Sequence, residues 1–112
     1  MRSFSAALGA LCVATLSLAA GAVQAQGAIK IGEINSYKAQ PAFLGSYKKG
    51  MELAVAEVNR TGGINGRKLA LVVRDDNGNP GDAVRAADEL LAREKVDVLM
   101  GSFLSHVGLA LT

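Results

Sequence analysis

Adjacent serine and histidine residues near the end of the 112-residue chain are the first side chains whose types could do chemistry. Ser105 beside His106 suggests nucleophilic catalysis, in which a histidine activates a serine hydroxyl. Neighbouring residues rarely orient their side chains for such a triad, and no carboxylate that would orient the histidine is identifiable. We therefore expect His106 to face solvent or to lie at the edge of a ligand site. We expect Ser105 to cap a helix, to contact a ligand, or both.

A pair of aspartates raises the second chemical question. Asp75 and Asp76 follow an apolar run, as the metal-binding carboxylates of phosphoacceptor receiver domains do. Such a site also needs acidic residues after the first strand, where only Glu33 is near, and an aspartate after the third, where residues 100–102 read Met-Gly-Ser. We expect the two aspartates to form loop hydrogen bonds and helix caps instead. We predict neither a metal nor any other cofactor.

The first 25 residues have the layout of a secretory signal peptide. Arg2 supplies a positive start, residues 6–20 are almost entirely Ala, Leu, Val and Gly, and residues 23–25 (Val-Gln-Ala) suit a signal peptidase. The apolar run is shorter than the ~20 residues that a membrane-spanning helix needs. We therefore predict export to the periplasm with cleavage after Ala25.

Cysteine content and charge narrow the classes of protein further. The only cysteine, Cys12, lies within the apolar leader, so the mature part has no disulfide partner and depends on core packing. Removing Arg2 with the leader lowers the net charge from +2 to +1, and the remaining charges are interspersed. This pattern gives no basic stripe for nucleic acid.

Three apolar runs alternate with helical patterns after the leader. Residues 29–34, 69–73 and 96–100 are rich in β-branched and aliphatic side chains, which predicts three strands. Between the first two, a stripe at helical spacing predicts a helix with Tyr47, Met51, Ala54, Val55 and Val58 on its buried face. Gly62-Gly63 should end this helix, and Asn65-Gly66 should form a tight turn.

A second helix is predicted to begin at Asn79-Pro80. Asn79 suits the N-cap, Pro80 the first helical position, and Asp82 the positive end of the helix dipole. The predicted buried face consists of Val84, Ala87, Leu90 and Leu91. A third helix is predicted to begin near Ser105 and to continue to the end of the chain at Thr112.

This alternation predicts a doubly wound α/β fold with a parallel sheet of flavodoxin-like strand order 2-1-3. In that order the first and third strands are neighbours, and the crevice at their carboxyl ends is the expected ligand site. Residues 35–43 and 102–106 should meet there. A sheet of three parallel strands has two unpaired edges, so we expect residues 26–112 alone to aggregate or fold poorly. A sharp cooperative melt of a soluble monomer would contradict this expectation.

An ordered string of motifs resembles a known family. Residues 50–59 (GMELAVAEVN), 62–69 (GGINGRKL) and 75–80 (DDNGNP), followed by Gly101-Ser102 and Ser105, are similar to the N-terminal lobe of the branched-chain amino acid (Leu/Ile/Val)-binding proteins. These are type I periplasmic solute-binding proteins of ABC transporters. The resemblance implies two α/β lobes that close on a ligand, with residues 26–112 forming the start of the first lobe.

The resemblance also implies contact residues. Ser105 matches the serine that holds the ligand's α-carboxylate at a helix N-terminus, where free N–H groups favour an anion. Phe43 matches the aromatic residue that packs on the ligand side chain from the loop after the first strand. Ser102, Phe103 and His106 complete the expected set. The loop at 35–41 departs from the small Ser-Gly-Pro loop common in the family, and this indicates a different ligand, such as an amide, a carboxylic acid or an aromatic acid.

These inferences predict a non-enzymatic periplasmic receptor for an amino acid or similar small anion, with an inner-membrane ABC permease as its partner. Two alternatives belong to other classes. An exported α/β enzyme would use Asp75, Asp76 or His106, and a ligand-sensing ectodomain would carry a membrane helix and a signalling domain further along the chain.

Overall fold

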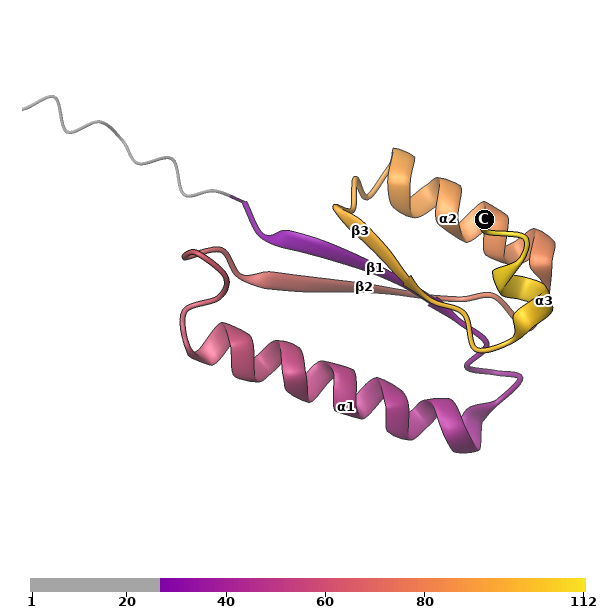
Figure 1. Ribbon diagram of the computed structural model, residues 1–112, viewed down its shortest axis with the longest axis horizontal. Coiled ribbons are helices and arrows are strands. Elements are labelled where there is room, and N and C mark those ends of the chain that lie inside the picture. Colours follow the sequence, from indigo (N-terminus) through magenta and orange to yellow (C-terminus); the bar gives the residue numbers. More distant parts are fainter. Residues whose placement is uncertain (1–26) are drawn as a thin grey trace, which may run out of the picture.

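The computed structural model describes residues 27–112, in which one parallel sheet lies between two helical layers (Figure 1). The elements in chain order are β1 (Ile29–Asn35), α1 (Pro41–Arg60), β2 (Leu69–Asp75), α2 (Pro80–Ala92), β3 (Val98–Gly101) and α3 (Ser105–Gly108). The predicted leader at residues 1–25, with Cys12, lies outside the described residues. In the described part of the chain, no helix is both long enough and apolar enough to cross a bilayer.

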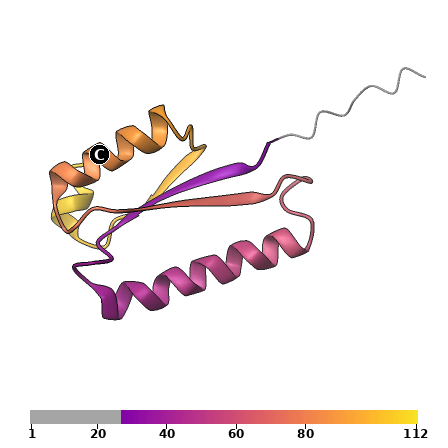
Figure 2. The same ribbon diagram turned by 180° about the vertical axis from the view of Figure 1, so that it is seen from behind.

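The sheet has the predicted strand order, β2-β1-β3, with both pairings parallel. Helix α1 covers one face of the sheet, and α2 and α3 cover the other (Figures 1 and 2). The doubly wound prediction is therefore confirmed. The third strand begins two residues later than predicted, because Lys95 turns the chain with a φ of 53° and Asp97 still leads into the strand.

The core lies between the sheet and α2. Its buried members are Ile34, Ala83, Ala86, Ala87, Leu90, Val96 and Val107. Ala87 and Leu90 were predicted, but Val84 and Leu91 are 40% and 52% exposed, so the expected face was wrong at those two positions. The helix turns its alanines toward the sheet, where short side chains permit a close approach of helix and strand.

The face of α1 that packs on the sheet is close to the predicted one. Tyr47, Met51, Val55 and Val58 are half-buried, whereas Ala54 is exposed, contrary to the prediction. Leu44, which the periodicity did not include, is the one fully buried residue of this helix. The predicted stop is confirmed, since Gly62 and Gly63 have φ values of 104° and 80°.

The predicted turn before β2 and the predicted N-cap of α2 are both present. Asn65 and Gly66 both have positive φ, and a bridge between Ile64 and Arg67 closes the turn. At the start of α2, the Asn79 side chain accepts a hydrogen bond of 3.1 Å from the Asp82 N–H. Pro80 is the first helical residue.

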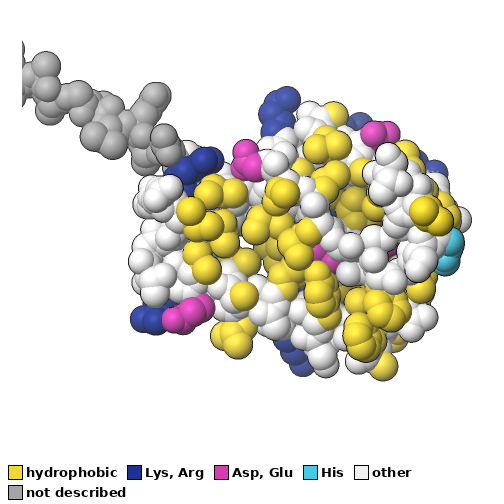
Figure 3. Space-filling model, in the orientation of Figure 1, with side chains coloured by type: hydrophobic (Ala, Val, Ile, Leu, Met, Phe, Trp, Pro, Cys, Tyr) yellow, Lys and Arg dark blue, Asp and Glu magenta, His cyan; other side chains and the backbone are white. Residues whose placement is uncertain are grey.

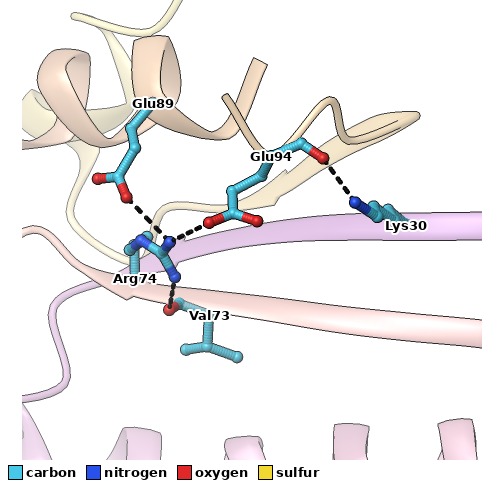
Figure 4. Close-up of polar contacts among 5 residues, drawn as sticks. All are labelled: Lys30, Val73, Arg74, Glu89 and Glu94. Carbon is cyan, nitrogen blue, oxygen red and sulfur yellow. Dashed lines mark hydrogen bonds and ion pairs between the residues drawn. The ribbon is translucent and has the colours of Figure 1, made fainter. Parts of the chain in front are cut away.

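Ionic contacts hold the end of α2 to the sheet (Figure 4). Arg74 on β2 donates 3.0 Å hydrogen bonds to Glu89 on α2 and to Glu94 in the following loop. The Lys30 ammonium donates to the Glu94 carbonyl at 2.9 Å. Because these side chains are partly exposed, each ion pair contributes at most about 1 kcal/mol.

Helix α3 has a single turn, ending at Gly108, so the prediction that it continues to Thr112 is wrong. The N–H groups of Val107 and Gly108 both bond to the Leu104 carbonyl, and a further turn closes from Leu111 to Gly108. Glycine has low helix propensity, which accounts for the early end.

Candidate functional site

The carboxyl ends of β1 and β3 lie side by side, as predicted. The Ser102 N–H donates a 2.9 Å hydrogen bond to the Ile34 carbonyl, directly joining the two strand ends. Residues that follow both strands therefore meet at the expected crevice, which is the usual ligand position in open α/β sheets.

The turn after β3 has a left-handed backbone at two successive residues. Gly101 has a φ of 122° and Ser102 a φ of 74°. For a residue with a Cβ, this region of backbone space costs about 1–2 kcal/mol. Such conformations cluster at binding sites, where the surrounding structure maintains them. Ser102 is thus held in an unfavourable conformation at the crevice, a feature that no pattern in the sequence predicts.

Replacing Ser102 by glycine tests whether this conformation serves binding. Ser102→Gly should raise the free energy of unfolding by about 1 kcal/mol, because glycine adopts positive φ without a Cβ penalty. If the hydroxyl contacts a ligand, the same variant should bind that ligand more weakly. Chemical denaturation and ligand titration of the complete protein measure the two effects, and unchanged stability would show that the turn is not strained.

Two phenylalanines form an apolar pair at the crevice. The ring centroids of Phe43 and Phe103 are 4.9 Å apart with an interplanar angle of 33°, a favourable tilted arrangement. Phe43 and Phe103 are 61% and 45% exposed, so part of the pair is accessible for contact. Phe43 lies in the first turn of α1 and not in the preceding loop, which corrects the predicted placement.

Ser105 is the first residue of α3, and Leu104 holds the N-cap position without a side-chain cap bond. The alternative that Ser105 is a plain N-cap is therefore wrong. Its side chain is exposed, and within residues 27–112 its hydroxyl has no hydrogen-bond partner. The backbone N–H groups of Ser105 and His106 likewise have no acceptor in that part of the chain. Three donors at the start of α3 are thus free to bind an anion.

His106 is exposed and points toward the loop after β2, where its Nε2 lies 3.2 Å from the Gly78 carbonyl oxygen. This contact requires the tautomer that carries a proton on Nε2. His106 lines neither of the two hollows described below. Of the five predicted site residues, His106 is the one that lies outside both linings.

Two hollows meet at the turn after β3. One has a volume of about 170 Å³ and includes Asn35, Phe43 and Tyr47 in its wall. The other, of about 610 Å³, lies beside β3, an outer strand of the sheet in the described residues, and includes Ser105 in its wall. Gly101, Ser102 and Phe103 line both, so this short segment is the wall that they share. Hydrophobic side chains gather around β3 on this side of the molecule (Figure 3).

A buried polar network, which the sequence did not reveal, lies directly behind the crevice. Glu33 is fully buried on β1 and accepts hydrogen bonds from the Tyr37 hydroxyl at 2.6 Å and the Asn35 amide at 3.0 Å. Burial raises the pKa of Glu33, and the two hydrogen bonds partly oppose this rise. Burial and the bond to Glu33 also raise the pKa of Tyr37.

Asp75, the last residue of β2, and Asp76, the residue after it, form the loop contacts that were expected of them. Asp75 accepts from the backbone N–H groups of Lys38 at 2.9 Å and Asn77 at 2.7 Å. Asp76 is fully buried and accepts from the Ser36 hydroxyl at 2.6 Å and the Gly78 N–H at 2.8 Å. In the described region, no group of three His, Cys, Asp or Glu side chains is placed to hold a metal ion.

Comparison with known proteins supports the resemblance drawn from the motifs. Residues 28–112 match the family described as periplasmic binding protein. The chain is 35% identical over 96 residues to Leu/Ile/Val-binding protein homolog 7 of Brucella abortus, a match that covers 85% of this chain and 24% of the relative. The match thus spans about a quarter of the length of this relative and of the amino acid binding protein of Pseudomonas aeruginosa.

Solved structures show the same fold with different ligands. The branched-chain amino acid transporter substrate-binding protein LivJ from Streptococcus pneumoniae, in complex with isoleucine, has a TM-score of 0.67 and 31% identity over 74% of this chain and 24% of its own. A solute-binding protein of an ABC transporter from R. palustris, in complex with benzoate, has a TM-score of 0.64 and 35% identity over 76% of this chain and 23% of its own. Similar folds therefore accommodate both an aliphatic amino acid and an aromatic acid.

Proposed function

Because the chain belongs to the periplasmic binding protein family, we propose that it forms part of the first lobe of a receptor for a small organic acid. The ligand would bind at the carboxyl ends of β1 and β3. A second lobe would close over it by hinge motion, and the closed form would deliver it to an ABC permease in the inner membrane. Residues 1–25 would direct export and be removed near Ala25.

One observation carries this proposal: unpartnered donors lie beside an exposed apolar pair. The Ser105 hydroxyl and the N–H groups of Ser105 and His106 suit a carboxylate. Phe43 and Phe103 suit a compact apolar group on the same molecule. A hydrogen bond to a charged group contributes about 1.5–3 kcal/mol. We therefore propose that the contacts to the carboxylate contribute more to affinity than packing against the two phenylalanines. Helix α3 is too short for a large dipole, and these individual donors must do most of the binding.

The apolar contact surface is compatible with two ligand classes. The related structures contain isoleucine in one case and benzoate in the other. An aliphatic side chain and an aryl ring both pack well against phenylalanine. We propose a monocarboxylate with a compact apolar body, either a branched-chain amino acid or an aromatic acid.

Calorimetric titration of the protein expressed from its complete reading frame tests the function. L-Isoleucine or benzoate should bind, and the corresponding compound without a carboxylate, L-isoleucinol or benzamide, should bind at least about tenfold more weakly. Ser105→Ala should weaken binding of the acid by about tenfold or more on the same grounds.

Ser46→Ala provides the matched control, since Ser46 is an exposed serine on α1 outside both hollows. Its affinity should equal that of the wild type. Failure of every amino acid, amide and organic acid to bind the wild type would refute the proposed function. Equal affinities for Ser105→Ala and Ser46→Ala would remove Ser105 from the site.

A further inference from the structure

Asn35, the last residue of β1, is bonded to the loops that follow all three strands. It is 3% exposed. Its main-chain carbonyl accepts from the Asp76 N–H at 3.0 Å, which joins it to the loop after β2. Its side-chain oxygen accepts from the Ser36 N–H at 3.2 Å and from the Phe103 N–H at 2.9 Å. One side chain thus fixes the loop after β3 to the loop after β1.

The buried carboxylate of Glu33 determines which way the Asn35 amide points. Glu33 accepts a hydrogen bond at each of its two carboxyl oxygens, so the Asn35 Nδ2 faces it, and the contact is 3.0 Å long. This leaves Oδ1 directed at the Phe103 N–H. The Tyr37 hydroxyl donates to the other Glu33 oxygen at 2.6 Å and keeps the carboxylate in place.

We propose that Asn35 is a positioning residue for ligand binding, which holds Phe103 and the Ser102 turn in the conformation that faces the crevice. This inference rests on the proposed function in so far as it concerns affinity. Asn35 acts through the backbone of the loop after β3, and Glu33 acts through Asn35. A loop that is already held in its binding conformation loses less conformational freedom when the ligand binds, and this increases affinity.

In the hydrogen bond between these two side chains, Asn35 donates and Glu33 accepts. A pair of substitutions that exchanges the donor and the acceptor tests the proposal. Asn35→Asp has the size of the native residue but places a second carboxylate against Glu33, and two buried like charges repel. In the double variant Asn35→Asp/Glu33→Gln, the amide introduced at position 33 donates to the carboxylate introduced at position 35. The amide oxygen at position 33 still accepts from Tyr37, and the second carboxylate oxygen at position 35 still accepts from Ser36 and Phe103. Every bond of the network is then restored with one polarity reversed.

The experiment measures amide hydrogen exchange at Phe103 and calorimetric affinity for benzoate and L-isoleucine, using the complete protein. Asn35→Ala and Asn35→Asp should each accelerate exchange at Phe103 and weaken probe binding by about tenfold. The double variant should recover both properties. Leu90→Ala, which opens a cavity in the core under α2, is the control for loss of stability alone. It should leave affinity within about twofold of wild type at a temperature where the protein is folded.

Unchanged exchange at Phe103 in Asn35→Ala would overturn the proposal, as would a double variant that recovers neither property. Loss of affinity in Leu90→Ala equal to that in Asn35→Ala would also overturn it, because the effect would then follow from instability. If neither probe binds the wild type, the proposed function fails in its present form. The exchange series still decides whether Asn35 positions the loop.

Discussion

Replacing Gly101 by alanine is expected to lower the free energy of unfolding by about 3 kcal/mol or more. A Cβ at this position would lie 2.0 Å from the Ile34 carbonyl oxygen, which is a backbone atom and cannot rotate away. The φ of 122° adds a conformational penalty for any residue with a Cβ. The two terms, each about 1–3 kcal/mol, act together. Urea denaturation of the complete protein measures the change.

Gly50→Ala is the matched control for this substitution. Gly50 lies within α1, and no atom would lie within 4 Å of an added Cβ. Alanine should therefore stabilise the helix by about 0.5–1 kcal/mol. The two variants add the same methyl group with opposite expected signs. A Gly101→Ala protein as stable as wild type would mean that β1 and β3 do not approach as closely as described, and the crevice would lose its geometry.

The fold was predictable because local signals and topology agree. Apolar runs at the three strands, the Asn79-Pro80 start and the Gly62-Gly63 stop each have a direct physical cause, and right-handed crossovers leave few strand orders. Helix faces were less predictable. The sequence offers both large and small apolar residues on α2, and hydrophobicity alone favours Val84 and Leu91. Close packing selects Ala83 and Ala86 instead, which only the helix-to-sheet distance explains.

The site residues were predictable where their position in the chain, directly after a strand, determines their place in the fold. Ser102, Phe103 and Ser105 lie at the crevice because they follow β3, and the strand order places that end beside β1. Phe43 was assigned to the correct region but to the wrong element, since Pro41 starts α1 earlier than the helical stripe indicated.

The buried network was not predictable from residue type. Glu33 and Asn35 are polar residues that alternate along β1 with Gly32 and Ile34, and a half-exposed strand shows the same pattern. The structure buries both polar residues, and Ile34 on the opposite face joins the core with α2. Only two patterns read together indicate the network. The polar face of β1 packs against the apolar stripe of α1, so its polar side chains become buried and need hydrogen-bond partners. Their identity depends on loops that meet only in the folded chain.

Asp76→Ala is expected to lower the free energy of unfolding by about 2–4 kcal/mol. The substitution leaves the buried Ser36 hydroxyl and the half-buried Gly78 N–H without their acceptor, and an unsatisfied buried group costs about 1–3 kcal/mol. Loss of the unfavourable charge interaction between Asp76 and Glu33 offsets part of this cost. Denaturation at neutral pH measures the sum.

Asp88→Ala separates this effect from a general loss of negative charge. Asp88 is exposed on α2 and has no hydrogen-bond or ion-pair partner among the described residues, so its removal should change stability by less than about 0.5 kcal/mol.

Ser36→Ala combined with Asp76→Ala then completes a double-mutant cycle. Because the two side chains are bonded at 2.6 Å, the double variant should be less destabilised than the sum of the single variants. Strict additivity would show that Asp76 does not tie the loops after β1 and β2 together through Ser36.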